Sequence, residues 1–198
     1  MTNRERLCLL LPLVVASFAL SLVFLACGPR TPPTRVVQTK TIRPPAPGKA
    51  QLVFVRPHRV GDRSPNVTLW DGTRPLVSLA LSQTFQVDLD PGRHQLVALT
   101  HGADVIDANL VAGKTYYVYL WLTTYMHHTV VHLNPLHPNH KHWKDKDRWI
   151  KQSRFVEVIP KNIPLWSKRH RPRAAEALKK YDPKGDAAKR AIHANYGI

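Results

Sequence analysis

The side chains best suited to chemistry are the histidines in one short stretch of the chain, YMHHTVVHLNPLHPNHKHW. Neutral imidazole is a common ligand of Zn, Cu and Ni. The candidate ligands are His127, His128, His132, His137, His140 and His142. Pro135 and Pro138 would break any helix that brought them together, and no HExxH-type spacing is present. We therefore treat a metal site here as the alternative interpretation, and a polar, partly cationic loop as the favoured one.

A second set of useful side chains lies in YYVYLWL, just before the histidines. Alternate residues of a strand face the same side, so Tyr117, Tyr119 and Trp121 would share one face. An exposed row of such rings could stack on sugars and hydrogen-bond through its polar tips. The competing interpretation is a central strand whose second face is covered by the roughly 70 residues that follow it, and we favour this burial.

No catalytic motif stands out elsewhere. Serines such as Ser78, Ser82 and Ser153 have no base placed beside them in a known pattern. His94 follows a Pro-Gly turn, where ring packing and a local hydrogen bond explain it. We therefore expect a protein that is not an enzyme and needs no cofactor.

Cys27 is the remaining reactive side chain, and the residues before it decide its chemistry. Arg4 and Arg6 form a positive head, and the apolar run from Leu7 to Ala26 carries no charge, which is the layout of a secretory signal. The run is also long enough for an uncleaved membrane anchor. Its end, LAC, resembles the lipobox of bacterial lipoproteins, in which a peptidase cuts before a cysteine that carries a diacylglycerol.

That resemblance implies a signal peptide over 1–26 and a lipid on Cys27, which becomes the first residue of the mature chain. Cys8 would leave with the signal peptide, so no thiol would remain for a disulfide. An aspartate after the cysteine retains such proteins in the inner membrane, whereas Gly28 stands here. We expect a cell-envelope location with the lipid in the outer membrane and the protein facing the periplasm.

Two composition changes divide the mature chain into a tether and a domain. Residues 27–49 hold six prolines and no acidic residue, which predicts an extended, basic spacer. Residues 50–160 contain short β-branched and aromatic runs between turn signals such as Asp71-Gly72 and Asp90-Pro91-Gly92. This pattern predicts a mainly β domain, an antiparallel, Greek-key-like β-sandwich of about seven or eight strands.

The strings LDPGRHQL and LVAGKTYYVYLWL make a more specific resemblance. They resemble the small β-sandwich domains of the PEGA and carboxypeptidase-regulatory types, which recur in uncharacterised bacterial lipoproteins. The matching positions are Leu89, Pro91, Gly92, His94, Leu96, Gly102, Leu110, Gly113 and Tyr117. The resemblance implies a fold and a location, and it carries no active-site residue to this chain.

Residues 161–198 form a basic, partly helical C-terminal extension. PRAAEALKKY predicts one short helix, and DAAKRAIHANYG predicts a second that stops at Gly197. The net charge of +16 would suggest nucleic acid in a cytosolic protein, but export excludes that partner. We therefore expect a lipid-anchored, non-enzymatic envelope protein that binds a protein partner or an anionic envelope component, with metal binding as the alternative.

Overall fold

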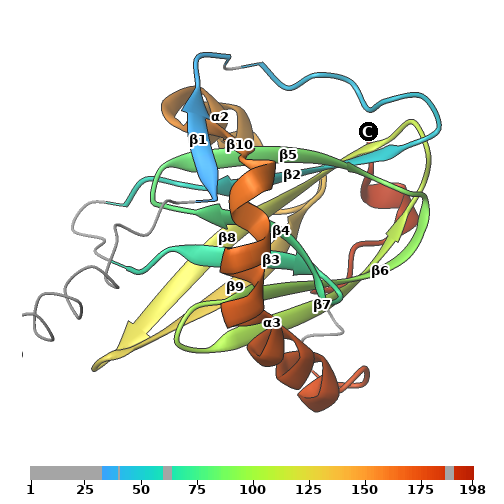
Figure 1. Cartoon of the computed structure of the whole chain (residues 1–198). Coiled ribbons are helices and arrows are strands. Elements are labelled where there is room, and N and C mark those ends of the chain that lie inside the picture. The colour runs from blue at the N-terminus through green and yellow to red at the C-terminus, as the bar shows by residue number, and fades with distance from the viewer. Residues whose placement is uncertain (1–32, 40, 60–63, 186–189) are drawn as a thin grey trace, which may run out of the picture. The chain divides into compact units, whose positions relative to one another are not determined.

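Two β-sheets form the body of the protein (Figure 1). The computed structural model describes residues 33–39, 41–59, 64–185 and 190–198, and ten strands lie within these ranges. They are β1 (Thr34–Val37), β2 (Ala50–Arg56), β3 (Val67–Asp71), β4 (Arg74–Leu79), β5 (Gln83–Leu89), β6 (Gly92–Leu99), β7 (Ala103–Leu110), β8 (Thr115–Tyr125), β9 (His128–Leu136) and β10 (Arg154–Val158). The described helices are η1 (Trp143–Asp145), α2 (Lys146–Gln152), η2 (Pro160–Asn162), α3 (Ile163–Lys180) and η4 (Ala194–Tyr196).

The larger sheet has the order β1-β10-β5-β2-β8-β9, and the smaller one has the order β4-β3-β6-β7. Most neighbours are antiparallel, but β2 pairs with β8 and β10 pairs with β5 in parallel. The prediction of a mainly β sandwich with a helical C-terminal extension is confirmed. The predicted strand number was too low, because β1 and β9 lie in segments that were interpreted as tether and loop.

The strand pattern explains the core between the sheets. Phe85, Val87 and Leu89 alternate along β5, and all three pack into the main apolar cluster, as the period of two predicts. Gly72, in the predicted Asp71-Gly72 turn, has a φ of 55° and joins β3 to β4. Positive φ is costly for residues with a side chain, so this glycine suits the tight hairpin.

Each sheet also has an apolar outer face, and a helix covers it (Figure 1). On the smaller sheet, Trp70, Val97 and Leu99 pack against Ala174 and Ala177 of α3. On the larger sheet, a second cluster joins strand residues to the η1 and α2 segment; its buried members are Val53, Val55, Tyr117, Tyr119, Leu136, Ile150 and Phe155. The sandwich is therefore a four-layer structure with a helix outside each sheet.

The extension differs from its prediction in two ways. The helix α3 begins at Ile163, so Pro172 lies inside it rather than near its first turn. Residues 186–189, in the second predicted helix, lie outside the described residues, and 190–198 follow β7 and β8 instead of forming an α-helix. Asn109 donates its backbone N–H to the oxygen of Ile192 (2.9 Å), and Thr115 donates to Ile198 (2.8 Å). A Cβ on Gly197 would lie 2.7 Å from the Tyr116 ring, so glycine permits this close packing rather than stopping a helix.

The interpretation of 27–49 as a free spacer does not hold for its described part. Thr34–Val37 form β1, which pairs with β10 along its whole length. Ile159 also donates its backbone N–H to the oxygen of Pro33 (2.7 Å). Val37 and Ile42 pack on the second apolar cluster. The chain therefore joins the sandwich from about residue 33.

We predict that a fragment starting at Lys49 is less stable than one starting at Pro33. The shorter fragment loses β1 and the packing of Val37 and Ile42, which should lower the free energy of unfolding by about 3 kcal/mol. Urea denaturation of both fragments measures this difference. As a control, Arg35→Ala in the longer fragment breaks only an exposed ion pair with Glu157 and should cost less than about 1 kcal/mol. Equal unfolding midpoints for the two fragments would contradict the prediction.

Candidate functional site

The aromatic row on β8 does not form an open platform. Tyr117 and Tyr119 are buried, as favoured from the sequence, and the cover comes from η1 and α2. The Tyr117 ring meets Trp143 edge-on with centroids 6.0 Å apart, and the Lys146 ammonium lies 4.6 Å from the Tyr117 ring centroid. Burial raises the pKa of both tyrosines. Sugar stacking on these two rings would require the η1 and α2 segment to move away.

Trp121 behaves differently from the two tyrosines because it lies beyond the covered part of the strand. It is 39% exposed, and the Arg59 guanidinium lies 4.0 Å from its ring centroid. Arg59 also donates to the backbone oxygen of Leu122 (3.0 Å). One ring of the predicted row therefore remains accessible, held beneath a cation.

The six candidate histidines fall into separate places. His127 and His128 lie at the turn between β8 and β9, and His132 contacts the Thr123 hydroxyl (3.0 Å) further along the hairpin. Only His137, His140 and His142 come together, with centroids 5.8 Å apart for the first two and 5.7 Å for the last two. Three of the six candidate ligands therefore lie on the hairpin, away from the other three.

His140 and His142 each use the Nδ1 atom of the ring in a hydrogen bond. The backbone N–H of His142 donates to Nδ1 of His140 (3.1 Å), and Nδ1 of His142 faces the Asp145 carboxylate (3.1 Å). Burial, with a smaller effect of His137, His142 and Lys141, lowers the pKa of His140, which favours its neutral form. Across the described residues, however, no three His, Cys, Asp or Glu side chains form a group that could hold a metal ion.

His94 has the local role that its position suggested. Its Nδ1 lies 3.0 Å from both oxygens of Asp71, and its Nε2 lies 2.8 Å from the backbone oxygen of Asp90. These contacts join the β3–β4 turn to the β5–β6 turn. Both ring nitrogens of His94 make polar contacts within the protein, so the geometry supports a structural role for this side chain.

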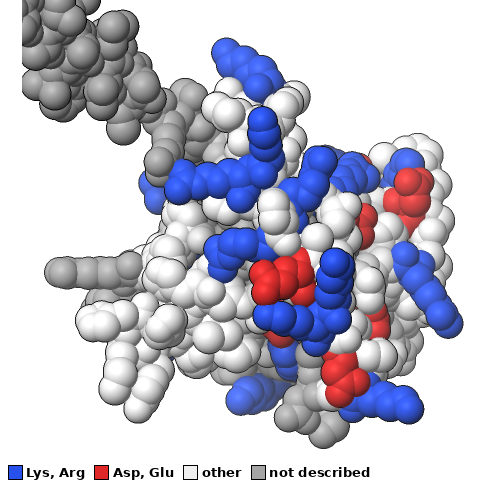
Figure 2. Space-filling model, turned by 60° about the horizontal axis from the view of Figure 1, so that its bottom comes forward, with Lys and Arg blue, Asp and Glu red and all other residues white. Residues whose placement is uncertain are grey.

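The basic extension presents a concentrated charged surface. One side of α3 packs on the smaller sheet, where Trp166 stacks on Trp70 with centroids 5.3 Å apart. The rest of the helix surface exposes six cations, which we call the α3 basic surface: Lys168, Arg169, Arg171, Arg173, Lys179 and Lys180. Glu176 is the one acid of this helix, and Lys180 pairs with it at 2.6 Å. Basic side chains spread widely over the face in Figure 2, while acidic ones keep to small patches.

The charge on α3 also affects a neighbouring histidine. Burial and the cations Arg169 and Arg173 lower the pKa of His170. Sequence reasoning located the positive charge in the extension and predicted the second half of this helix, but it missed the first half, because Pro172 suggested a start rather than an interior. The spacing of Trp166, Ala174, Ala177 and Tyr181 at multiples of three or four residues was the signal that could have found it.

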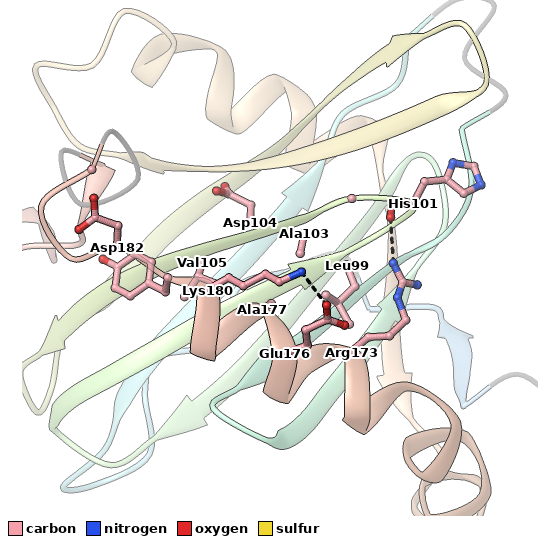
Figure 3. Close-up of a pocket in the computed structure, with 13 residues that line it drawn as sticks. Leu99, His101, Ala103, Asp104, Val105, Arg173, Glu176, Ala177, Lys180 and Asp182 are labelled. Atoms are coloured by element: carbon pink, nitrogen blue, oxygen red, sulfur yellow. Dashed lines mark hydrogen bonds and ion pairs between the residues drawn. The ribbon is translucent and has the colours of Figure 1, made fainter.

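A pocket of about 560 Å³ lies between α3 and the start of β7 (Figure 3). Arg173 spans one side by donating to the backbone oxygens of Thr100 (2.7 Å) and His101 (3.0 Å). Asp104 receives two bonds of 2.7 Å from Arg190. These hydrogen bonds and this ion pair hold α3 and the C-terminal segment against the sheet, so the polar groups around the pocket have mainly a structural role.

Tyr181 also lines this pocket. Its hydroxyl donates to the Asp107 carboxylate (2.9 Å), and burial together with this contact raises the pKa of Tyr181 to about 12. The tyrosine is therefore a neutral hydrogen-bond donor at physiological pH, which suits a structural link from α3 to β7.

Comparisons with protein-family models, curated proteins and solved structures found no match for the chain. The resemblance to PEGA-like domains and to lipoproteins stays a prediction, and Cys27 lies outside the described residues. Within the part of the chain that the structure describes, no helix combines the length and apolarity needed to cross a bilayer. The α3 basic surface is the strongest candidate site that the geometry offers.

Proposed function

We propose that the protein is a lipid-anchored, non-enzymatic envelope protein that uses the α3 basic surface to bind an anionic envelope component. One observation carries the proposal. The apolar side of α3 packs against the smaller sheet, and the rest of its surface carries a single acid and six cations, of which Arg173 also bonds to the β6–β7 turn. A helix that served only to cover the sheet would not need such an excess of cations over acids.

Simple electrostatics gives the strength of such a surface. Each lysine or arginine close to an anionic surface contributes about 1 kcal/mol, so a few of them give useful affinity without a shaped pocket. The net charge of +16 adds a long-range attraction. Phosphates of acidic lipids and carboxylates of peptidoglycan share the required negative charge. A protein partner for the same surface would have to present an acidic face.

Charge reversal on α3 should test this proposal. We expect Lys168→Glu, Arg169→Glu and Arg171→Glu together to weaken binding of the 33–198 fragment to acidic vesicles or to peptidoglycan roughly 100-fold or more at 0.1 M salt, because three contributions of about 1 kcal/mol are lost. Co-sedimentation measures the affinity. All three residues are exposed, so folding should be preserved.

A matched control changes the charge equally on the opposite side of the sandwich. Lys141→Glu, Lys144→Glu and Lys151→Glu are exposed positions around η1 and α2, and they should reduce binding much less. Binding should also fall steeply between 0.1 and 1 M salt, where the Debye length shrinks from about 10 to about 3 Å. Equal losses in both variants would contradict a role specific to α3. Binding that requires added Zn or Cu and survives high salt would favour the histidines instead.

A further inference from the structure

The hairpin of β8 and β9 extends beyond the sheet that it belongs to (Figure 1). β2 pairs with β8 only as far as Tyr119, whereas β9 continues to pair as far as Tyr125. Among the described strands, β9 alone therefore accompanies β8 from Leu120 to its end. We call residues 120–133 the β8–β9 arm.

The arm ends in an exposed apolar point. Tyr125 and His128 form the last pair, so Met126 and His127 make a two-residue turn. Tyr125 and Met126 are each 77% exposed, and Trp121 lies partly exposed behind them. The fourteen residues of the arm contain no Asp, Glu, Lys or Arg. An uncharged point with these side chains is unusual on a protein of such high charge.

The arm is braced rather than loose, at Thr129, directly beside the last pair of Tyr125 and His128. Thr129 receives two hydrogen bonds on its backbone oxygen, from the Thr100 hydroxyl (2.6 Å) and from the Gly102 N–H (3.1 Å). Its own N–H donates to Nδ1 of His101 (3.2 Å). The turn between β6 and β7 thus holds the arm, and the point projects from a fixed support.

The same turn connects the arm to the α3 basic surface. Arg173 of α3 donates to the backbone oxygens of Thr100 and His101, and the rings of His101 and His128 lie 6.4 Å apart. On the arm's other flank, Arg59 lies over Trp121. Cations therefore lie along the arm behind its point, Arg59 beside β8 and Arg173 at the turn that holds β9.

We propose that Tyr125 and Met126 insert into the headgroup layer of an acidic lipid bilayer, while the flanking cations hold the anionic headgroups. Tyrosine and tryptophan favour the membrane interface, and cations beside them attract acidic lipids. A two-residue point is much smaller than the roughly 800 Å² that each partner buries in a standard protein interface. This inference rests on the proposed function and names acidic lipid as the anionic component.

The test uses the mature lipoprotein in proteoliposomes. With the Cys27 thiol acylated, Met126→Cys supplies the only free thiol, which can carry an environment-sensitive fluorophore. We expect lipids that carry quenchers at different depths to place this label about 5–10 Å inside the surface of acidic vesicles. Thr73→Cys, in the exposed β3–β4 turn, is the matched control and should stay in water. Neutral vesicles should quench neither label.

The other outcomes separate this inference from the proposed function. A label at 126 that no lipid quenches, in a protein whose α3 surface still binds peptidoglycan, would overturn the insertion and leave the proposed function standing. A label that becomes shielded only when two protein chains crosslink would show that the point docks on a second copy, which also overturns the inference. Quenching that persists after the α3 charge reversal would support insertion, and it would count against the proposed binding by the α3 basic surface.

Discussion

Replacing Cys27 with alanine should abolish incorporation of labelled fatty acid and leave the precursor uncut. The thiol is the only group through which the predicted diacylglycerol can be attached, and cleavage at a lipobox follows that attachment. The expected effect is therefore all or none, rather than a graded loss. Metabolic labelling and mass spectrometry of the N-terminus in the producing cells measure both events.

Cys8→Ala provides the matched control for this experiment. Cys8 lies inside the apolar run and would leave with the predicted signal peptide, so its replacement should change neither lipidation nor cleavage. An unmodified, intact N-terminus on the wild-type chain would contradict the lipoprotein assignment. It would favour the alternative in which the apolar run stays as a membrane anchor.

The central strands could be predicted from the sequence because local and tertiary signals agree there. β5 alternates in hydrophobicity, and the turn after it carries Gly92 in positive φ, so period and turn chemistry lead to the same answer. β10 lies within the 50–160 region predicted to be β, and its SRFVEV segment carries an apolar pattern that Pro160 ends. In these segments each residue's own preference matches the fold.

The segments that sequence reasoning missed owe their structure to neighbours far away in the chain. β1 is only four residues long in a proline-rich stretch, and it becomes a strand because the edge of β10 accepts it. β9 contains Pro135, which cannot donate to a ladder, but β9 lies at the edge of its sheet, where one side needs no partner strand. No local pattern carries this information.

The candidate site shows the same division. Positive charge in the extension could be counted from the sequence, but its restriction to one side of α3 depends on which side meets the sheet. The six histidines looked like one group because they are close in sequence. The hairpin takes His127, His128 and His132 away from His137, so sequence proximity does not become spatial proximity.

The contact of Trp70 with Trp166 should be the main link between α3 and the sheet. Trp70 is fully buried, its ring lies 14° from the plane of Trp166, and its indole N–H donates to the Thr68 hydroxyl (3.3 Å). Trp70→Ala removes the largest buried side chain of this layer. We expect it to lower the free energy of unfolding by about 3–5 kcal/mol, because the cavity that remains cannot close fully.

Urea denaturation measures the stability loss, and limited trypsin digestion reports on α3, whose exposed lysines and arginines become cleavable when the helix leaves the sheet. Trp166→Ala should cost less, since Trp166 is only partly buried. Trp121→Ala is the matched control: it removes the same ring from a partly exposed position on the arm and should cost less than about 1 kcal/mol. If Trp70→Ala and Trp121→Ala lose similar stability, or if trypsin cuts α3 no faster in the Trp70 variant, the stacked pair does not hold the basic surface in place.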